Sequence, residues 1–162
     1  MNLLKSIFSY IISLFKTENL LDYKVNPLKE DKLKTTPVTE NKPTKIEILA
    51  NAIAKWEGDT QGTNPGNIKF SSLTQSWGAK KGRKATDGGY FAIFNSKEQG
   101  FIALCNFLTL GCKDQLKYFH KPEDRLLGGF LKKFAGNPDI KYIKGIAKEV
   151  GCSLETNMKD FL

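Results

Sequence analysis

The chain has few of the residues on which disulfide frameworks and metal centres depend. Its three cysteines, Cys105, Cys112 and Cys152, are odd in number and include no CxxC pair, so a disulfide framework is not expected. The single histidine, His120, excludes most zinc peptidases and amidases, because these usually need two or three imidazole ligands. With 40% hydrophobic and 26% charged residues, the composition also excludes bulk disorder, collagen-like repeats and a protein with several membrane spans.

The chain has fewer acidic than basic residues: it contains 25 Lys and Arg and 17 Asp and Glu, which gives a formal net charge of +8. This balance favours a polyanionic partner such as nucleic acid, anionic lipid or a bacterial cell wall, and does not choose among them. The densest basic run is Lys80-Lys81-Gly82-Arg83-Lys84. As a functional element it would bind the phosphates of nucleic acid or of teichoic acid. It lacks the interleaved aromatic residues that base stacking needs, so we interpret it as a solvated loop and expect no specific nucleic acid partner.

The first 44 residues differ in composition from the rest. Residues 3–15 read LLKSIFSYIISLF, which is shorter than the ~20 apolar residues of a spanning helix and is not followed by the small residues of a signal-peptide cleavage site. An export signal, an interfacial anchor and a helix packed on the domain all remain open. We expect residues 1–21 to act as an anchor or export signal, with membrane association through residues 3–15. The expected location is the cell envelope, the periplasm or a phage virion.

Two composition changes divide the remainder of the chain. Residues 22–44 are rich in Lys, Thr, Glu and Pro and nearly free of large apolar groups, which is typical of a flexible linker. Residues 45–162 form the expected folded domain. Within it, Thr44-Lys45-Ile46-Glu47 and Ser96-Lys97-Glu98-Gln99 have the pattern of capping boxes, and they predict helices that end at Gly58 and near Gly111.

The rest of the domain predicts an α+β fold that is mainly α, with a small glycine-rich β-hairpin region. Further helices are expected over residues 123–134 and 138–150, with a short one after Ser153. Between the first two helices, residues 59–95 predict loops and a hairpin whose turn is Asp87-Gly88-Gly89. An all-helical bundle is the main alternative, but it would leave residues 59–95 as a long structureless loop, which is uncommon in a compact domain.

Glu57 is the first candidate for chemistry. It follows Ile46 by eleven positions, nearly three helical turns, so it shares the buried face of the predicted helix. Burial and the negative end of the helix dipole both disfavour an ionised carboxylate there, and a retained proton is what a general acid needs. The alternative is a solvent-facing Glu at a frayed helix end. Asp59 points elsewhere if the helix continues, and Asp87 is explained more simply by its turn.

Three strings carry a resemblance to a known family: Ile53-Ala-Lys-Trp-Glu57-Gly58, Asn64-Pro65-Gly66-Asn67-Ile68 and Thr86-Asp-Gly-Gly-Tyr-Phe-Ala-Ile-Phe94. With the later Phe134-Ala-Gly-Asn-Pro138 and Tyr142, they resemble phage and bacterial lysozyme-like proteins that cleave peptidoglycan, in particular the soluble lytic transglycosylases. The resemblance covers about residues 45–162 and implies a lysozyme-like domain. Gln61-Gly62-Thr63 stands where many relatives carry an Arg, so a saccharide contact by that Arg is not carried over.

The resemblance also implies roles for single residues. It makes Glu57 the catalytic acid/base and places Tyr142 to hydrogen-bond near it. The residues it implies for substrate binding are Asn64, Asn67, Asp87, Tyr90, Phe91 and Tyr142. It implies cleavage of the β-1,4 bond between N-acetylmuramic acid and N-acetylglucosamine in peptidoglycan glycan strands, by a monomer without cofactor or metal.

Three functions stay open at this point. A hydrolytic glycosidase normally pairs its acid with a second carboxylate, and only Glu57 has a strong case here, so a lytic transglycosylase is favoured over a hydrolytic lysozyme. A non-catalytic virion or envelope protein that binds glycan through the same fold is the third. A Cys–His hydrolase built on Cys105 or Cys112 with His120 is disfavoured, because a thiol on a buried helix face is usually inert.

Overall fold

Two capped helices form the centre of the fold. The helix α2 (Lys45–Glu57) begins after Thr44, whose hydroxyl accepts from the Glu47 N–H at 3.2 Å while Glu47 Oε2 accepts from the Thr44 N–H at 2.7 Å. This exchange satisfies two backbone donors that have no partner inside the helix. The helix α4 (Lys97–Cys112) begins after Ser96, which accepts from the Gln99 N–H, but Gln99 returns its bond to the Asn95 N–H. Both predicted helices are confirmed.

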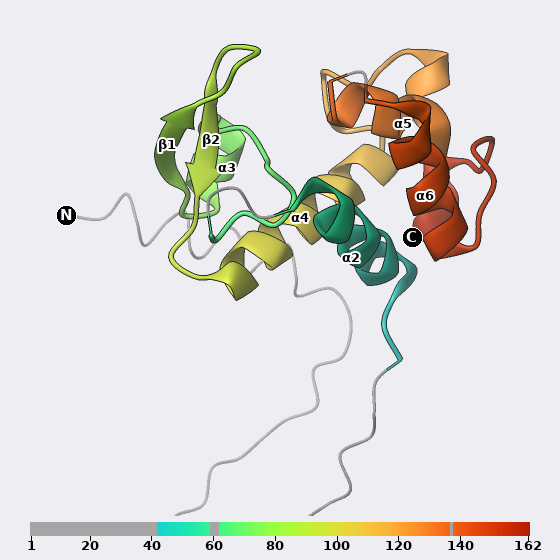
Figure 1. Cartoon of the computed structure of the whole chain (residues 1–162), viewed down its shortest axis with the longest axis horizontal. Helices are drawn as coiled ribbons and strands as arrows, with labels where there is room; N and C mark the ends of the chain where they lie inside the picture. Colours follow the sequence, from blue (N-terminus) through green and yellow to red (C-terminus); the bar gives the residue numbers. More distant parts are fainter. Residues whose placement is uncertain (1–41, 59–61, 137) are drawn as a thin grey trace, which may run out of the picture. The chain divides into compact units, whose positions relative to one another are not determined.

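The computed structural model describes residues 42–58, 62–136 and 138–162, all within the unit Glu40–Leu162 (Figure 1). In these ranges the fold is α+β and mainly α, with one two-stranded antiparallel sheet. The elements other than α2 and α4 are α3 (Ser72–Ser76), β1 (Lys80–Lys84), β2 (Tyr90–Ile93), the 3-10 helix η1 (Pro122–Arg125), α5 (Leu127–Phe134), α6 (Ile140–Val150) and the 3-10 helix η2 (Met158–Phe161).

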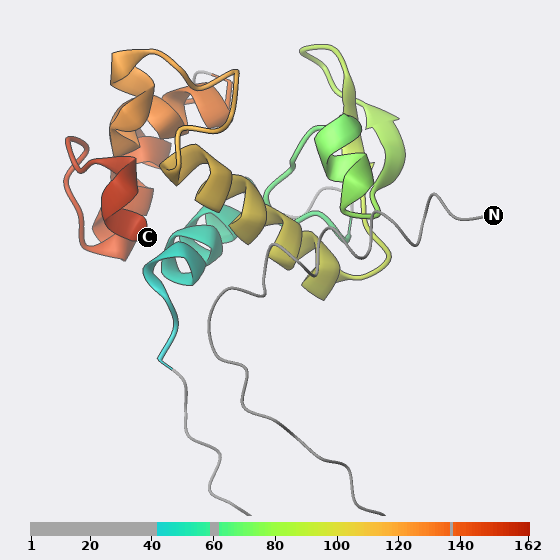
Figure 2. The same ribbon diagram turned by 180° about the vertical axis from the view of Figure 1, so that it is seen from behind.

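The predicted hairpin is present. Its strands pair with Lys80 opposite Ile93 and Lys84 opposite Tyr90, with a shift of register between Lys81 and Lys84. A further extended segment runs along the other edge of β2, where the Ala92 N–H donates to the Ile68 carbonyl and the Phe70 N–H to the Tyr90 carbonyl. Figures 1 and 2 place the hairpin and α3 on one side of α4 and the pair α5 and α6 on the other. The interpretation of residues 80–84 as a loop is wrong, because they form β1.

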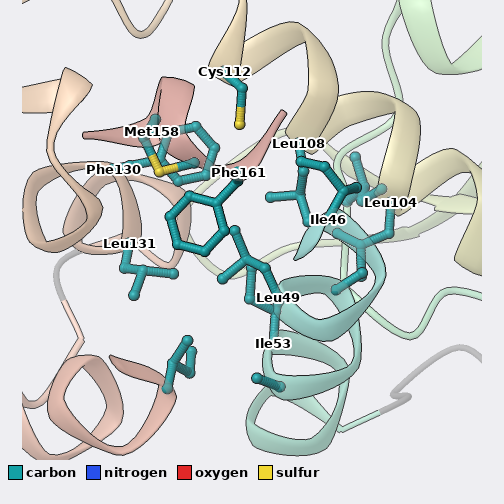
Figure 3. Packing of buried hydrophobic residues seen from close by; sticks show 14 of the residues in the cluster. Ile46, Leu49, Ile53, Leu104, Leu108, Cys112, Phe130, Leu131, Met158 and Phe161 are labelled. Carbon is teal, nitrogen blue, oxygen red and sulfur yellow. The ribbon is translucent and has the colours of Figure 1, made fainter. Parts of the chain in front are cut away.

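A continuous apolar core joins the helices (Figure 3). Leu49 and Ile53 of α2, Leu104 and Leu108 of α4 and Phe130 of α5 have no solvent-exposed surface. Burial of each such side chain contributes about 1.5–3 kcal/mol relative to exposure. The core therefore fixes the C-terminal end of α2, which carries Glu57, against the rest of the fold.

Two features differ from the sequence-based expectation. A single helix over residues 123–134 was expected, but the chain forms η1, then an extended Leu126 (φ −97°, ψ 146°), then α5. Leu126 bridges to Asn157, and the Leu127 N–H donates to the Thr156 carbonyl, so a contact distant in sequence interrupts the helix. The short helix α3 lies in a stretch that was expected to be loop.

The predicted apolar segment, residues 1–21, and nearly all of the predicted linker, residues 22–44, lie outside the described residues. Of the helices that are described, none combines the length and the apolar character required to cross a bilayer.

Candidate functional site

Glu57 is the last residue of α2, and its side chain is half-buried. Gly58 follows with φ 65°, a value that ends the helix and that glycine adopts without strain. Carbonyls in the last turn of a helix have no partner within it. The Glu57 carbonyl is satisfied instead by the side chain of Asn67, whose Nδ2 donates to it at 3.1 Å.

Two side chains donate to the Glu57 carboxylate. Tyr142 Oη donates to Oε1 at 2.6 Å, and Asn67 Nδ2 lies 3.3 Å from Oε2. These partners come from α6 and from the loop before α3, 85 and 10 positions from Glu57, and converge on one carboxylate. Among the described residues these are the only side chains hydrogen-bonded to it. Asp59 lies outside the described residues.

The segment Asn64-Pro65-Gly66-Asn67 forms the turn that brings Asn67 to Glu57. The Asn67 N–H donates to the Asn64 carbonyl at 3.0 Å, and Pro65 takes the turn position that proline favours. Gly66 is required by space, because a Cβ there would lie 2.7 Å from Leu104 Cδ1. Asn67 itself has φ 48°, the left-handed region in which Asn is enriched among non-glycine residues.

Asn64 holds this turn against the sheet. It has no exposed surface, its Nδ2 donates to the carbonyls of Ile68 at 2.9 Å and Ala92 at 3.0 Å, and its Oδ1 accepts from the Ile68 N–H at 3.0 Å. The substrate-binding role expected for Asn64 would need surface that this side chain does not offer. Asn64 instead fixes the turn that carries Asn67, and Asn67 contacts Glu57 directly.

Tyr142 is on the first turn of α6 and half-buried. Desolvation raises the pKa of its hydroxyl far above the ordinary value, and the charge of Glu57 adds to this. The hydroxyl is therefore a stable donor at any working pH. The contact between Tyr142 and Glu57 that the resemblance implies is present.

A second group of contacts supports Tyr142 and was not found from the sequence. The indole of Trp56 meets the Tyr142 ring edge to face, with centroids 6.2 Å apart, and packs over Gly145, where a Cβ would lie 2.0 Å from Trp56 Cζ2. Trp56 Nε1 donates to Glu149 Oε1 at 3.0 Å, and Lys55 Nζ pairs with the same oxygen at 2.8 Å. The spacing 142, 145, 149 along α6 is the one available signal, since it places these positions on one helix face.

An open groove of about 520 Å³ is lined by Asn67, but not by Glu57 or Tyr142. One wall is the segment from Asn67 to Leu73, which carries Ile68 and Lys69. The facing wall comes from the end of α4, the segment after it and the end of α5, with Phe107, Leu116, Lys117, Tyr118, Phe119, Lys133 and Phe134. Apolar ring surface with polar groups at the rim is typical of ligand sites in general.

The remaining residues of the predicted site lie on the hairpin. Lys69 Nζ and Arg83 approach the ring of Phe91, with Nζ and Cζ at 4.5 and 5.1 Å from the centroid, and Lys81 Nζ lies 3.7 Å from the centroid of Tyr90. Asp87, in the hairpin turn, pairs with Lys69, and that hydrogen bond lowers the pKa of the Asp87 carboxyl. The structure links these residues to the groove through Lys69, and among the described residues the hydrogen bonds to the Glu57 carboxylate come from Tyr142 and Asn67 instead.

The thiols and the imidazole are placed unfavourably for nucleophilic chemistry. Burial raises the pKa of both Cys105 and Cys112 to about 11, whereas a nucleophilic thiol needs a lowered pKa. His120 is exposed, and its Nδ1 contacts the Lys117 carbonyl. Within the described ranges, no three His, Cys, Asp or Glu residues are grouped so as to hold a metal ion.

Comparisons with protein-family models, with curated proteins and with solved structures give no match to this chain.

Proposed function

We propose that this chain is a peptidoglycan-cleaving glycosidase with a lysozyme-like domain, and that it acts as a lytic transglycosylase on the β-1,4 bond after N-acetylmuramic acid. The observation that carries the proposal is the Glu57 carboxylate, held by Tyr142 at 2.6 Å and by Asn67 at 3.3 Å. The same Asn67 lines the 520 Å³ groove, which offers room for a glycan.

The mechanism uses Glu57 twice. The carboxyl group first protonates the glycosidic oxygen, and the bond from the anomeric carbon to that oxygen breaks. The positive charge that develops on the sugar is stabilised by its own N-acetyl group and by the fixed dipole of the Tyr142 hydroxyl. The Glu57 carboxylate then takes the proton from the muramoyl 6-hydroxyl as its oxygen attacks the anomeric carbon, which closes a 1,6-anhydro ring and restores the acid.

One carboxylate is sufficient for this route, and the surroundings of Glu57 favour it. Tyr142 and Asn67 are both neutral donors, so neither can serve as the second carboxylate that hydrolysis normally uses. Asp87 is ionised and paired with Lys69 in the hairpin turn. A hydrolytic mechanism would need Asp87 to serve as the second carboxylate from its position in the hairpin turn.

The test compares the full chain with Glu57→Gln on purified peptidoglycan, with Glu155→Gln as the matched control at an exposed position. We expect the wild type and Glu155→Gln to clear the suspension and Glu57→Gln to lose at least 100-fold in rate, as general acid catalysis contributes about 10²–10⁴-fold. Equal clearing by Glu57→Gln would contradict the assigned acid.

Mass spectrometry of the products separates the remaining alternatives, because hydrolysis adds one water that the anhydro product lacks. We expect 1,6-anhydromuramoyl ends. Reducing muramoyl ends alone would show a hydrolytic lysozyme and direct attention to Asp87. A wild type that sediments with peptidoglycan without cutting it would be a non-catalytic glycan-binding protein of a virion or envelope.

A further inference from the structure

The basic run that the proposed site does not use lies on one strand of the hairpin. Lys80, Lys81, Arg83 and Lys84 are all exposed on β1. Ala79 and Ala85, immediately outside the strand, are buried, so both ends of the strand are attached to the fold. The four cations are thus carried on a fixed ribbon.

Positive charge is concentrated in this part of the domain. Residues 69–94 hold five basic residues and one acidic residue, a net charge of +4, whereas the whole of residues 45–162 has 18 basic and 12 acidic residues, a net charge of +6. The one acid, Asp87, is paired with Lys69. Among the described residues, no acidic side chain lies within ion-pair distance of the four cations of β1.

The cations are also linked to the groove that Asn67 and Lys69 line. Lys69 lines that groove and lies over the ring of Phe91, and Arg83 lies over the same ring. On the neighbouring position of β2, Lys81 lies over Tyr90. The rings hold the charged groups of Lys69, Lys81 and Arg83 near the sheet, which reduces the entropy lost when an anion binds.

We propose that β1, through Lys80, Lys81, Arg83 and Lys84, binds a linear phosphodiester polymer of the bacterial cell wall, of the glycerol-phosphate or ribitol-phosphate type. Four cations within five residues of one strand offer partners for successive phosphates of a polyanion, and release of counterions from such a chain drives association. The choice of a wall polymer rests on the proposed peptidoglycan substrate. Binding there places the entrance of the groove on the wall.

Nucleic acid is the competing polyanion, and the aromatic contacts argue against it. Proteins that bind single strands stack bases on open aromatic faces. Here Tyr90 and Phe91, the aromatic residues of the sheet, each already have a cation over the ring. The hairpin therefore offers charge for phosphates without a free platform for bases.

The experiment measures binding of the full chain to purified lipid-free poly(glycerol phosphate) at several salt concentrations. The hairpin variant replaces Lys80, Lys81, Arg83 and Lys84 by Gln. The matched control variant replaces four other exposed lysines by Gln and so removes the same charge elsewhere, at Lys113, Lys144, Lys148 and Lys159. We expect the dissociation constant to rise at least tenfold for the hairpin variant and less than threefold for the control, with a shallower salt dependence only for the former.

Equal losses in the two variants would overturn the proposal, because net charge alone would then explain binding. Tighter binding of a single-stranded oligonucleotide of equal charge would overturn it in favour of nucleic acid. Thermal unfolding of both variants checks that the fold is retained, and single substitutions such as Arg83→Gln replace the quadruple variant if it unfolds. The binding experiment contains no glycan, so polymer binding can be observed even if the protein does not cleave peptidoglycan. Conversely, cleavage is measured on polymer-free peptidoglycan, so it can be observed even if the hairpin does not bind the polymer.

Discussion

Substitution of Gly145 by alanine tests whether the contacts behind Tyr142 matter to the acid. The new Cβ would lie 2.0 Å from Cζ2 of Trp56 and 2.6 Å from its Cε2 and Cη2. Carbon atoms in contact are about 3.5–4.0 Å apart. The rigid indole, which also donates to Glu149 and touches the Tyr142 ring, has to move away from α6 by more than one bond length.

The size of the effect follows from two opposing terms. Overpacking of this kind costs about 1–3 kcal/mol, and replacing a helical Gly by Ala returns about 1 kcal/mol. We expect a net loss of about 0–2 kcal/mol in the free energy of unfolding. The effect on activity is larger, because displacement of a group by about 1 Å can cost about 100-fold in rate, and Tyr142 is one helical turn from Gly145. A fall of at least tenfold in peptidoglycan clearing is expected.

A double-mutant cycle decides the cause. Urea unfolding and clearing rates are measured for Gly145→Ala, Trp56→Ala and the double variant, with Lys144→Ala as an exposed control in the same turn. Without the indole, Gly145→Ala should be neutral or stabilising by up to about 1 kcal/mol. If Gly145→Ala is as stable and as active as the wild type while Trp56 is present, the reasoning from this contact is refuted.

Three further predictions concern single contacts. Tyr142→Phe removes the donor 2.6 Å from Glu57 and should reduce the clearing rate at least tenfold, since a hydrogen bond to a charged group contributes about 1.5–3 kcal/mol. Asn64→Ala removes three hydrogen bonds to buried backbone groups and should lower the free energy of unfolding by about 2–4 kcal/mol in urea. Cys105 and Cys112 have a folded-state pKa of about 11 against an ordinary 9.0, so the stability they contribute should be complete below pH 9 and lost as pH rises through 11.

Each of these has its control and its contrary result. Ser153→Ala, which removes an exposed hydroxyl outside the groove, should keep the wild-type rate, and Tyr142→Phe doing so as well would remove the phenol from the mechanism. Asn106→Ala, at an exposed position, should leave urea unfolding unchanged, and an equally unaffected Asn64→Ala would contradict the role given to the turn. For the thiols, a variant with alanine at both cysteines should lose less stability between pH 9 and 11, and a wild type with flat stability over this range would refute the linkage.

Local signals predicted the central helices and the hairpin well. The caps at Thr44 and Ser96 and the turn residues Asp87-Gly88-Gly89 act on their immediate neighbours, so their consequences can be deduced from the chain alone. The break between η1 and α5 could not be deduced, because it depends on Leu126 meeting Asn157, 31 positions later.

The candidate site also contains residues that the sequence could predict and residues that it could not. Glu57 could be selected from its position at the end of an amphipathic helix. Its supporting contacts could not, because Trp56 reaches Gly145 and Glu149 only when α2 packs against α6. For Asn64 the sequence motif predicted substrate binding. In the structure both ends of its side-chain amide are hydrogen-bonded to backbone groups of the protein.

The order of the site residues along the chain has a consequence for synthesis. Glu57 and Asn67 leave the ribosome before Tyr142, which follows Glu57 by 85 positions and belongs to α6. A nascent chain that ends before Ile140 carries the acid without its phenolic partner and without the helix face that seats Trp56. The arrangement is therefore complete only once α6 has been made, and proteolysis that removes α6 would take it apart while leaving the acid itself in place.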